Sequence, residues 1–249
     1  MFYDWSFSDR IKCTDKEKDK CLNTVYRLLA FSNAARKEGI LSLEIYLDEP
    51  ITDPEIPSAF IRKALRLIID GTDPVNARRI LELSIISSGA AGKSLLDKCL
   101  VLEGILSIQS GDNPGITEEI LIAMLGEDYG DKLRKYVQEK NEKYIEKIKD
   151  DKIYSDETAL LEKLLKFSDN DIRRILREID ITELARGLAG ASGVTKCKIF
   201  DNIPVRVKSI LIEELQSLEM ISIDDIAVSQ KKIINVLEKL GEFDEIDNN

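Results

Sequence analysis

The segment SSGAAGKS, residues 87–94, is the first place in this chain where residue types suggest chemistry, because it has part of the pattern of a phosphate-binding loop. In such a loop, backbone amides of glycines and a lysine surround a phosphate. The pattern needs a glycine five residues before Gly92, and the sequence has Ser87 there. Helical patterns flank the segment on both sides, with no strand before it. We therefore interpret it as a flexible break between helices, with a nucleotide-binding enzyme as the alternative of another class.

Two acidic pairs, Asp150-Asp151 and Asp224-Asp225, are the other candidates for chemistry. The chain has no histidine, so the commonest general base is missing. Neither pair has metal-ligand spacing, and helix capping for Asp224-Asp225 and a solvated face for Asp150-Asp151 explain them better. We therefore expect no enzymatic activity, no cofactor and no metal.

The cysteines are four in number and match no zinc motif. Their spacing and the absence of histidine favour reduced thiols in a cytosolic protein, with Cys99 and Cys197 buried in the core. Besides these two, the chain contains Cys13 and Cys21.

The composition is that of a soluble globular protein, with 43% hydrophobic and 33% charged residues in a chain of 249. The formal net charge of −10 argues against binding nucleic acid or anionic lipid through charge. The longest uncharged run, residues 83–92, is far shorter than the roughly 20 residues of a membrane helix, so no membrane span is expected. The N-terminal sequence MFYDWSFSDRIKC carries acids and does not have the pattern of a signal peptide.

Apolar residues recur at helical spacing along almost the whole chain, and strand alternation is missing, which predicts an all-α fold. Gly71 and Gly111 mark helix ends, and Asp73-Pro74 marks a helix start. The turn Asn113-Pro114-Gly115 precedes a further helix. The helices predicted before this turn span 22–37, 58–70 and 94–110, besides the one that starts at Asp73-Pro74.

Residues 127–152 differ from the rest because both charges are dense there and the apolar stripe is thin. This pattern is typical of a solvated helix between two parts of a protein. We therefore expect two helical domains joined by a long charged helix. The expected boundaries are an N-terminal extension at 1–21, a helical domain at 22–126, the charged helical linker at 127–155 and a compact helical domain at 156–249.

The helix that follows Pro204 has a predicted polar side with a cation and an anion two turns apart. The sequence PVRVKSILIEELQSLEM places Arg206 and Glu213 nearly in line on that side, and Glu214 closer to the apolar arc. Ile212 is apolar on the polar side, which predicts an exposed contact point. A normal solvated face remains the alternative. The arc expected to face the core contains Val207, Ile210, Leu211, Leu215 and Leu218.

A similar pair occurs near the start of the chain, in AFSNAARKEGILSLEIYLDEP, residues 30–50. Arg36 and Glu44 lie on either side of Gly39 in an otherwise apolar, helical stretch. Solvation of an exposed face is one explanation, and a charged contact surface for another protein is the other.

The C-terminal part, about 160–246, resembles the C-terminal domain of the flagellar rotor protein FliG. The matching segments are LLKFSDNDIRRILREIDITELARGLAGAS, KIFDNIPVRVKSILIEEL and QKKIINVLEKLGEFDEI. The resemblance implies a compact helical bundle in which one helix carries charged residues that meet the stator. By position, these residues fall on Arg206, Glu213 and Glu214. Two positions depart from the family, because Ala189 replaces a lysine and Ser222 replaces an arginine.

The N-terminal part, about 22–125, resembles the cytoplasmic portion of the flagellar stator protein MotA. The segments YRLLAFSNAARKEGILSLE, LRLIIDGTDPVNARRILE and LEGILSIQSGDNPGITEEIL carry this resemblance. It implies that the stator's rotor-facing arginine and glutamate fall on Arg36 and Glu44. The membrane helices of that family are missing from this sequence.

Together the resemblances imply a non-enzymatic flagellar motor protein, which binds at the cytoplasmic rotor–stator interface through charged helix faces. The expected partners are flagellar stator and rotor proteins, with no nucleic acid. The expected location is the cytoplasmic face of the inner membrane, at the flagellar basal body. The alternative is a soluble regulator that masks or competes for rotor–stator contacts, by pairing of its two halves within one chain or by self-association.

Overall fold

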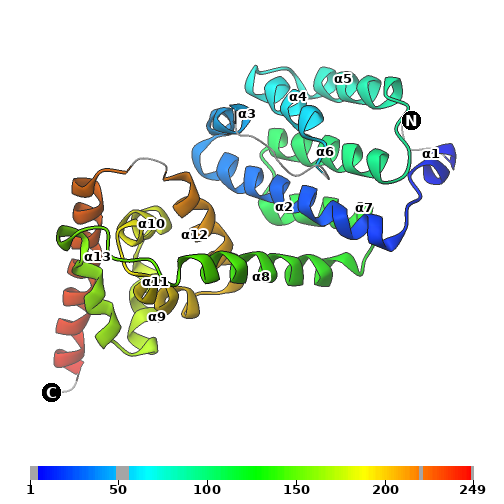
Figure 1. Cartoon of the computed structure of the whole chain (residues 1–249). Helices are drawn as coiled ribbons and strands as arrows, with labels where there is room; N and C mark the ends of the chain where they lie inside the picture. The colour runs from blue at the N-terminus through cyan, green and yellow to red at the C-terminus, as the bar shows by residue number, and fades with distance from the viewer. Residues whose placement is uncertain (1–4, 49–55, 219–220, 248–249) are drawn as a thin grey trace. The chain divides into compact units, whose positions relative to one another are not determined.

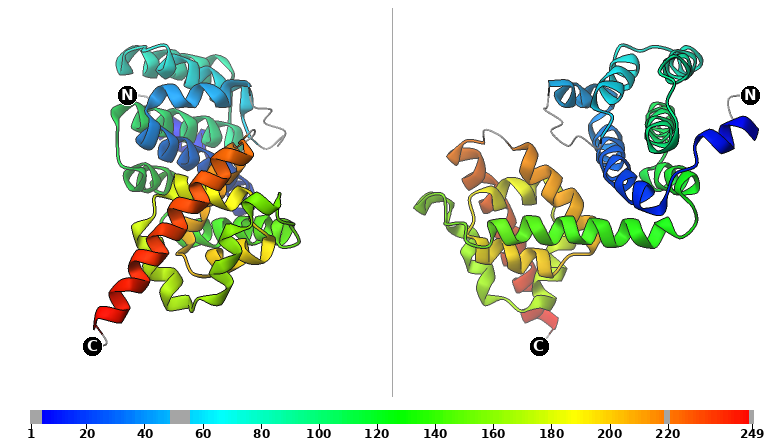
Figure 2. Two further views of the ribbon diagram at one scale, coloured as in Figure 1. Left: turned by 90° about the vertical axis from the view of Figure 1, so that its left-hand side faces the viewer. Right: turned by 45° about the vertical axis from the view of Figure 1, so that its right-hand side comes forward.

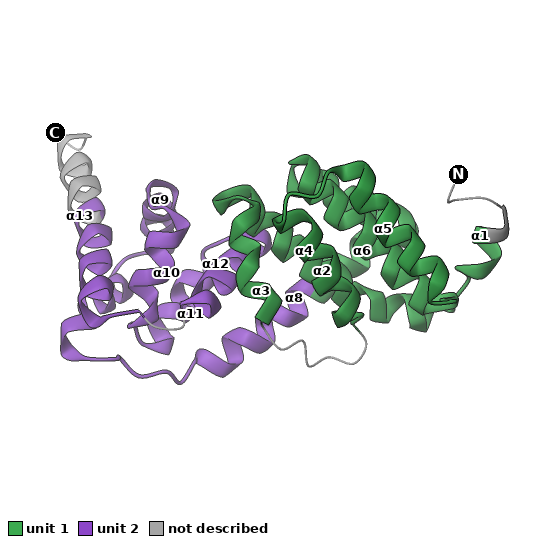
Figure 3. Ribbon diagram, turned by 90° about the horizontal axis from the view of Figure 1, so that it is seen from above, with its two compact units in different colours: residues 1–136 green, residues 137–249 purple. Residues whose placement is uncertain are grey.

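The computed structural model of the chain describes residues 5–48, 56–218 and 221–247. These residues form helices and turns and contain no strand, so the predicted all-α class is confirmed. The chain divides into two compact units, residues 1–136 and 137–249 (Figure 3). The division falls inside the segment 127–155, for which the sequence predicts a charged linker.

Unit 1 contains seven complete helices among its described residues, a short 3-10 helix and the first part of α8 (Figure 1). The predicted helices at 22–37, 58–70 and 94–110 correspond to α2, α4 and α6. The bounds are α1 Trp5–Arg10, α2 Asp15–Glu38, η1 Ile40–Glu44, α3 Ile45–Asp48, α4 Ser58–Ile69, α5 Pro74–Ser87, α6 Gly92–Ser110, α7 Pro114–Leu125 and α8 Tyr129–Ile148.

The N-terminal end of α2 differs from the sequence prediction, because the helix begins at Asp15 and not at residue 22. A capping box explains the earlier start. The Thr14 hydroxyl accepts a hydrogen bond from the Glu17 amide at 3.3 Å, and the Glu17 carboxylate accepts one from the Thr14 amide at 2.8 Å. Segment 1–21, predicted to be an extension, therefore includes the first turns of α2, while its residues 1–4 lie outside the described residues.

Helix α6 is the centre of unit 1, and α2, α4, α5 and α7 all pack against it (Figures 1 and 2). The helix is apolar almost all round, which is the pattern of a helix enclosed by others. Its buried carboxylate, Asp97, accepts hydrogen bonds from the Thr24 hydroxyl at 2.9 Å and from the Lys93 ammonium at 2.7 Å. This buried charge is thus paired and hydrogen-bonded, as burial requires.

The predicted start and stop signals of these helices are present in the structure. Asp73 caps α5 by accepting hydrogen bonds from the amides of Val75 and Asn76. Asn113 caps α7 in the same way, with proline at the first helical position. Gly111 ends α6 in the left-handed conformation, with φ of 75°.

Helix α8 belongs to both units, with residues 129–136 in unit 1 and the remainder in unit 2. In unit 1, Leu133 is buried and the Lys132 ammonium pairs with the Asp19 carboxylate at 2.8 Å. In unit 2, Tyr144 and Ile148 pack against the hydrophobic core. The thin apolar stripe of this charged helix is therefore packed, although its other faces are solvated.

Unit 2 is built around α10, which packs against α13 and α12. Its core joins side chains from α9, α10, α11, α12, α13 and the 3-10 helix η3. The bounds are η2 Asp156–Thr158, η3 Leu160–Lys166, α9 Asp169–Glu178, α10 Ile181–Ala189, α11 Gly193–Asp201, α12 Val205–Ser217 and α13 Ile223–Asp247.

All four cysteines are free thiols, and the prediction for them is right for one residue and wrong for another. Cys99 is buried as expected, and burial raises its pKa to about 12, so the group stays a thiol at neutral pH. Cys197 is only partly buried, because it lies on α11 beside core residues and not among them. Cys21 is buried instead.

Within the described ranges, no helix combines the length and the apolar character needed to cross a membrane. The same residues contain no group of three or more acids and cysteines arranged to hold a metal ion.

Candidate functional site

The charged helix α12 is held in place from two sides. On one side, Leu211 and Ile212 belong to the core of unit 2. On another side, the buried amide of Asn141 in α8 donates hydrogen bonds to the Ser209 hydroxyl at 3.1 Å and to the Val205 carbonyl at 3.3 Å. The sequence does not predict this second contact, because one asparagine and one serine leave no hydrophobic periodicity.

Arg206 is exposed in the first turn of α12, where the sequence predicts it. Glu213 and Glu214, near the other end of the helix, are half-buried. Burial raises the pKa of the Glu213 carboxyl to about 7, and the neighbouring charge of Glu214 adds to this rise. At neutral pH the Glu213 carboxyl is therefore only partly ionised.

The predictions for Ile212 and Glu213 need correction. Ile212 is 3% exposed and belongs to the core cluster, so it is not an exposed contact point. The arc that faces the core is displaced toward this residue, and Ile210 lies outside the cluster. Glu213 lies one turn after Ser209, on the side of α12 that packs against α8, so it is less exposed than the sequence predicts.

Arg36 and Glu44 are both exposed in unit 1. They do not share a continuous helix, because Gly39, with φ of 86°, ends α2. Arg36 lies in the last turn of α2, and Glu44 is the last residue of η1. Two apolar side chains near Glu44, Leu41 within η1 and Ile45 directly after it, are also exposed. The sequence did not predict this exposure. Exposed apolar residues next to charges are common in protein-contact surfaces.

The loop-like segment 87–94 lies between the end of α5 and the start of α6, so a helix and not a strand precedes it. Its lysine, Lys93, pairs with the buried Asp97 at 2.7 Å. A phosphate-binding loop needs its lysine directed at the bound phosphate. Here the ammonium of Lys93 is directed at the carboxylate of Asp97 instead. The geometry therefore gives the nucleotide-binding alternative no support.

The two acidic pairs have structural contacts. The Asp225 amide donates to the Ser222 hydroxyl at 3.1 Å, and that hydroxyl donates to the Asp225 carboxylate at 2.7 Å, which is a helix cap. The Asp151 carboxylate pairs with the buried Lys196 at 2.7 Å. The interpretation of Asp224-Asp225 as part of a helix cap therefore holds. Asp151 is not simply part of a solvated face, because its carboxylate also pairs with Lys196.

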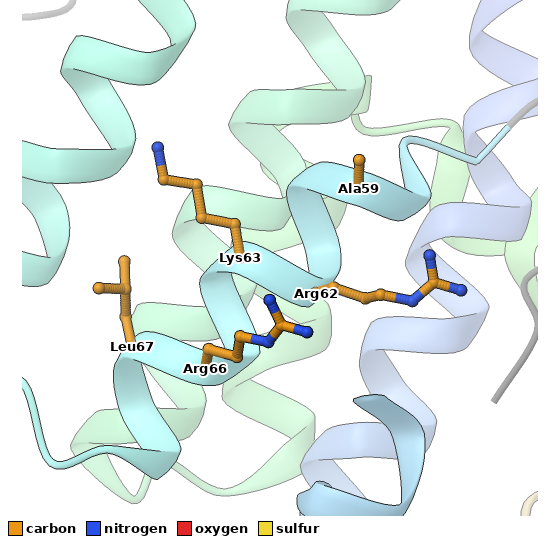
Figure 4. A pocket seen from close by; sticks show the side chains of 5 residues that line it. All are labelled: Ala59, Arg62, Lys63, Arg66 and Leu67. Atoms are coloured by element: carbon orange, nitrogen blue, oxygen red, sulfur yellow. The ribbon is translucent and has the colours of Figure 1, made fainter. Parts of the chain in front are cut away.

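A shallow cavity of about 360 Å³ lies along α4 in unit 1 (Figure 4). Its lining includes Arg62, Lys63 and Arg66 but no acid or nucleophile. The Lys63 ammonium donates to the Ser84 hydroxyl of α5 at 2.9 Å, while Figure 4 shows Arg62 leaving α4 on a different side. This arrangement has no group that could act as a general base.

The raised pKa of Glu213 predicts a pH-dependent stability. The ordinary value is 4.5, so between pH 4.5 and 7 the folded chain keeps a proton that the unfolded chain releases. The protonated Glu213 carboxyl makes its full favourable contribution to the free energy of unfolding below pH 4.5, and this contribution is lost as the pH rises through 7. We expect Glu213→Gln to raise the free energy of unfolding at pH 8 by about 1–3 kcal/mol, with a smaller effect at pH 5.

Urea unfolding at the two pH values measures this difference, and Glu178→Gln, at an exposed acid of α9, is the control. A carboxyl ¹³C titration reports the pKa of Glu213 directly. A titration midpoint near 4.5, or an equal effect of the substitution at both pH values, would contradict the prediction.

Comparison with known proteins places the second unit in a family. Residues 135–247 match the model of the FliG C-terminal domain. The flagellar motor switch protein FliG of Thermotoga maritima is 39% identical over 87 residues, which are 35% of this chain and 26% of that protein. The FliG protein of Borreliella burgdorferi is 37% identical over 87 residues, with 35% of this chain and 25% of that protein covered. The chain thus spans about a quarter of the length of these relatives.

The family match does not reach residues 22–126, so the resemblance of that part to MotA stays a prediction. The match does include residues 135–148 of α8 and every helix from α9 to α13. The charged helix α12, with Arg206 exposed and Glu213 and Glu214 half-buried, lies within it. Residues 135–247 therefore belong to the family of FliG C-terminal domains.

Proposed function

We propose that this chain is a non-enzymatic flagellar motor protein, which binds at the cytoplasmic rotor–stator interface through α12. The observation that carries the proposal is the exposed guanidinium of Arg206 on a helix of a FliG C-terminal domain. The relatives' name, flagellar motor switch protein, supplies the motor context. The proposed location is the cytoplasmic face of the inner membrane, at the flagellar basal body.

The physical character of the contact fits such a machine. An exposed ion pair is worth only about 0–1 kcal/mol, so each contact is easily broken. Several pairs together still set the orientation and the association rate of two proteins. Since Glu213 is partly protonated near neutral pH, it contributes less than a full negative charge to this face.

The two departures from the family also have structural counterparts. Ser222, which stands where the family has an arginine, is the residue that caps α13 through Asp225. Ala189, which stands where the family has a lysine, is the last residue of α10 and is half-buried. We propose that the chain contacts its partner with part of the rotor's charge set, centred on Arg206.

The proposed contact predicts a loss of motility when the charge of Arg206 is reversed. In cells that lack the native gene, we expect Arg206→Glu to reduce swimming speed at least fivefold, because it places an anion against the partner's complementary charge. Lys231→Glu is the matched control, since Lys231 is an exposed cation of unit 2 outside α12. A fluorescent tag on each variant reports whether the chain still gathers at flagellar bases.

Both variants should keep the helical content and the melting temperature of the native chain, because both side chains are exposed. Normal swimming of the Arg206→Glu strain would remove α12 as the contact surface. A tagged native chain spread evenly through the cytoplasm would argue for a soluble regulator.

A further inference from the structure

A cavity of about 470 Å³ lies in unit 2 beside the first turn of α12, between α9 and the junction of α11 with α12. Its volume is within the usual range of ligand sites. Helix α9 contributes Arg173, Leu176 and Arg177, while the junction and α12 contribute Asn202, Ile203 and Val207. All of these residues belong to the FliG C-terminal domain.

The cationic part of the lining is Arg173 and Arg177, which are four residues apart and therefore lie on the same side of α9. Among the described residues, neither guanidinium forms a salt bridge with a carboxylate. Asp201 also lines the cavity, so two cations are present against one anion. Planar guanidinium groups match the geometry of a carboxylate, which makes this lining suited to an acidic side chain.

The polar part of the lining is the Asn202 side chain, which is 8% exposed. Its Nδ2 donates to the Lys198 carbonyl at 2.9 Å and to the Asp169 carboxylate at 3.1 Å. Both partners are acceptors, which fixes the orientation of the amide. The Oδ1 atom is consequently left buried without a donor. A buried acceptor without a partner costs free energy, and Asn202 is one of the residues that line this cavity, so an N–H group that reached its Oδ1 atom would be stabilised there.

The apolar part consists of Leu176, Ile203 and Val207, with Pro204 at the start of α12. Ile203 is buried, and Leu176 and Val207 pack against the core of unit 2. The walls are thus built on packed side chains, and they offer an apolar side chain a contact surface. One cavity therefore presents two cations, one acceptor without a donor and an apolar wall.

We propose that this cavity binds an acidic residue of a protein partner, in a peptide segment where an apolar residue precedes the acid. The carboxylate contacts Arg173 and Arg177, a peptide N–H donates to Asn202, and the apolar side chain packs against Leu176 and Val207. The inference deepens the proposed function and rests on it only for the identity of the partner. The proposed function assigns only the charges of α12 to the contact surface, and this inference adds the cavity beside that helix.

The test uses a blocked dipeptide, N-acetyl-leucyl-aspartyl amide, added to the full ¹⁵N-labelled chain. We expect saturable shifts at the Asn202 side-chain amide and at the backbone amides of residues 176, 203 and 207. A dissociation constant of about 1–10 mM is typical for a ligand of this size. The neutral isostere N-acetyl-leucyl-asparaginyl amide should bind at least fivefold more weakly.

The double variant Arg173→Gln/Arg177→Gln should weaken binding of the aspartyl dipeptide at least fivefold, whereas Arg174→Gln, an exposed arginine of α9 outside the cavity, should not. Equal shifts with both dipeptides, shifts located elsewhere, or unchanged binding by the double variant would overturn the proposal. If the double variant lost its fold, the comparison of the two dipeptides on the native chain would decide.

The outcome is separable from that of the motility test. Dipeptide binding with normal swimming of the Arg206→Glu strain would sustain the cavity and reject the proposed function. Impaired swimming of that strain without dipeptide binding would reject the cavity alone.

Discussion

Replacing Gln230 with leucine is expected to lower the free energy of unfolding of unit 2 by about 3–5 kcal/mol, because three backbone groups, two in buried and one in a partly buried hydrogen bond, lose their partner. The Gln230 side chain is fully buried. Its Nε2 donates to the carbonyls of Thr158 at 2.8 Å and Gly187 at 2.9 Å, and its Oε1 accepts from the Leu160 amide at 3.0 Å. One side chain of α13 thereby connects η2, η3 and α10.

Leucine has a similar volume but no polar atom, so the cost comes from the unpaired backbone groups and not from a cavity. Hydrogen–deuterium exchange of α10 and α13 localises the effect to unit 2, and urea unfolding gives its size. Lys231→Leu changes the adjacent exposed residue and serves as the control. If Gln230→Leu left both the unfolding midpoint and the exchange of α10 unchanged, the network would not be a determinant of stability.

Replacing Gly193 with alanine is expected to destabilise unit 2 by about 3–4 kcal/mol through a clash with backbone atoms. A methyl group at this position would lie 2.1 Å from the Lys149 carbonyl oxygen and 2.3 Å from that of Ile148. These oxygens belong to the last residue of α8 and to the residue after it, and the Gly193 amide donates to the Asp151 carbonyl at 2.8 Å. Since both contacts are with backbone, no rotamer change can relieve them, and α11 must move away from α8.

Gly130→Ala is the matched control, because a methyl group there meets nothing within 4 Å and the residue lies inside α8. Alanine has the higher helix propensity, so this variant should be as stable as the native chain or about 0.5–1 kcal/mol more stable. Thermal and urea unfolding of both variants give the comparison. If Gly193→Ala were as stable as the native chain, the close contact between α11 and the end of α8 at Gly193 would not be required for stability.

The sequence predicts the helices of this protein well, and their ends best. Asp73-Pro74, Gly111 and Asn113-Pro114 are local signals, and each one ends or begins a helix where predicted. The start of α2 is the exception, since its capping box at Thr14 and Glu17 lies before the apolar pattern begins. Helix ends are readable because the unsatisfied amides and carbonyls there are capped by neighbours in sequence.

The burial of the candidate site residues was predictable only in part. Arg206, Arg36 and Glu44 are exposed as the sequence indicates. Ile212 differs because it belongs to the core cluster of unit 2, and Glu213 differs because a contact of α8 with α12, between Asn141 and Ser209, adds a second packed side to the helix. A helical wheel places each side chain relative to its own helix axis, but it does not show which other helices lie around it.

The sequence by itself determined the all-α class, the positions of most helices and the charged character of α12, because these depend on periodicity and on capping between near neighbours. Only the tertiary structure decided which side of α12 is open to solvent, how close α11 approaches α8 at Gly193, and how Gln230 satisfies three backbone groups. These features are contacts between residues dozens of positions apart, and a single sequence carries no periodic signal for such pairs. The raised pKa of Glu213 has the same origin, since burial is a property of the packed domain.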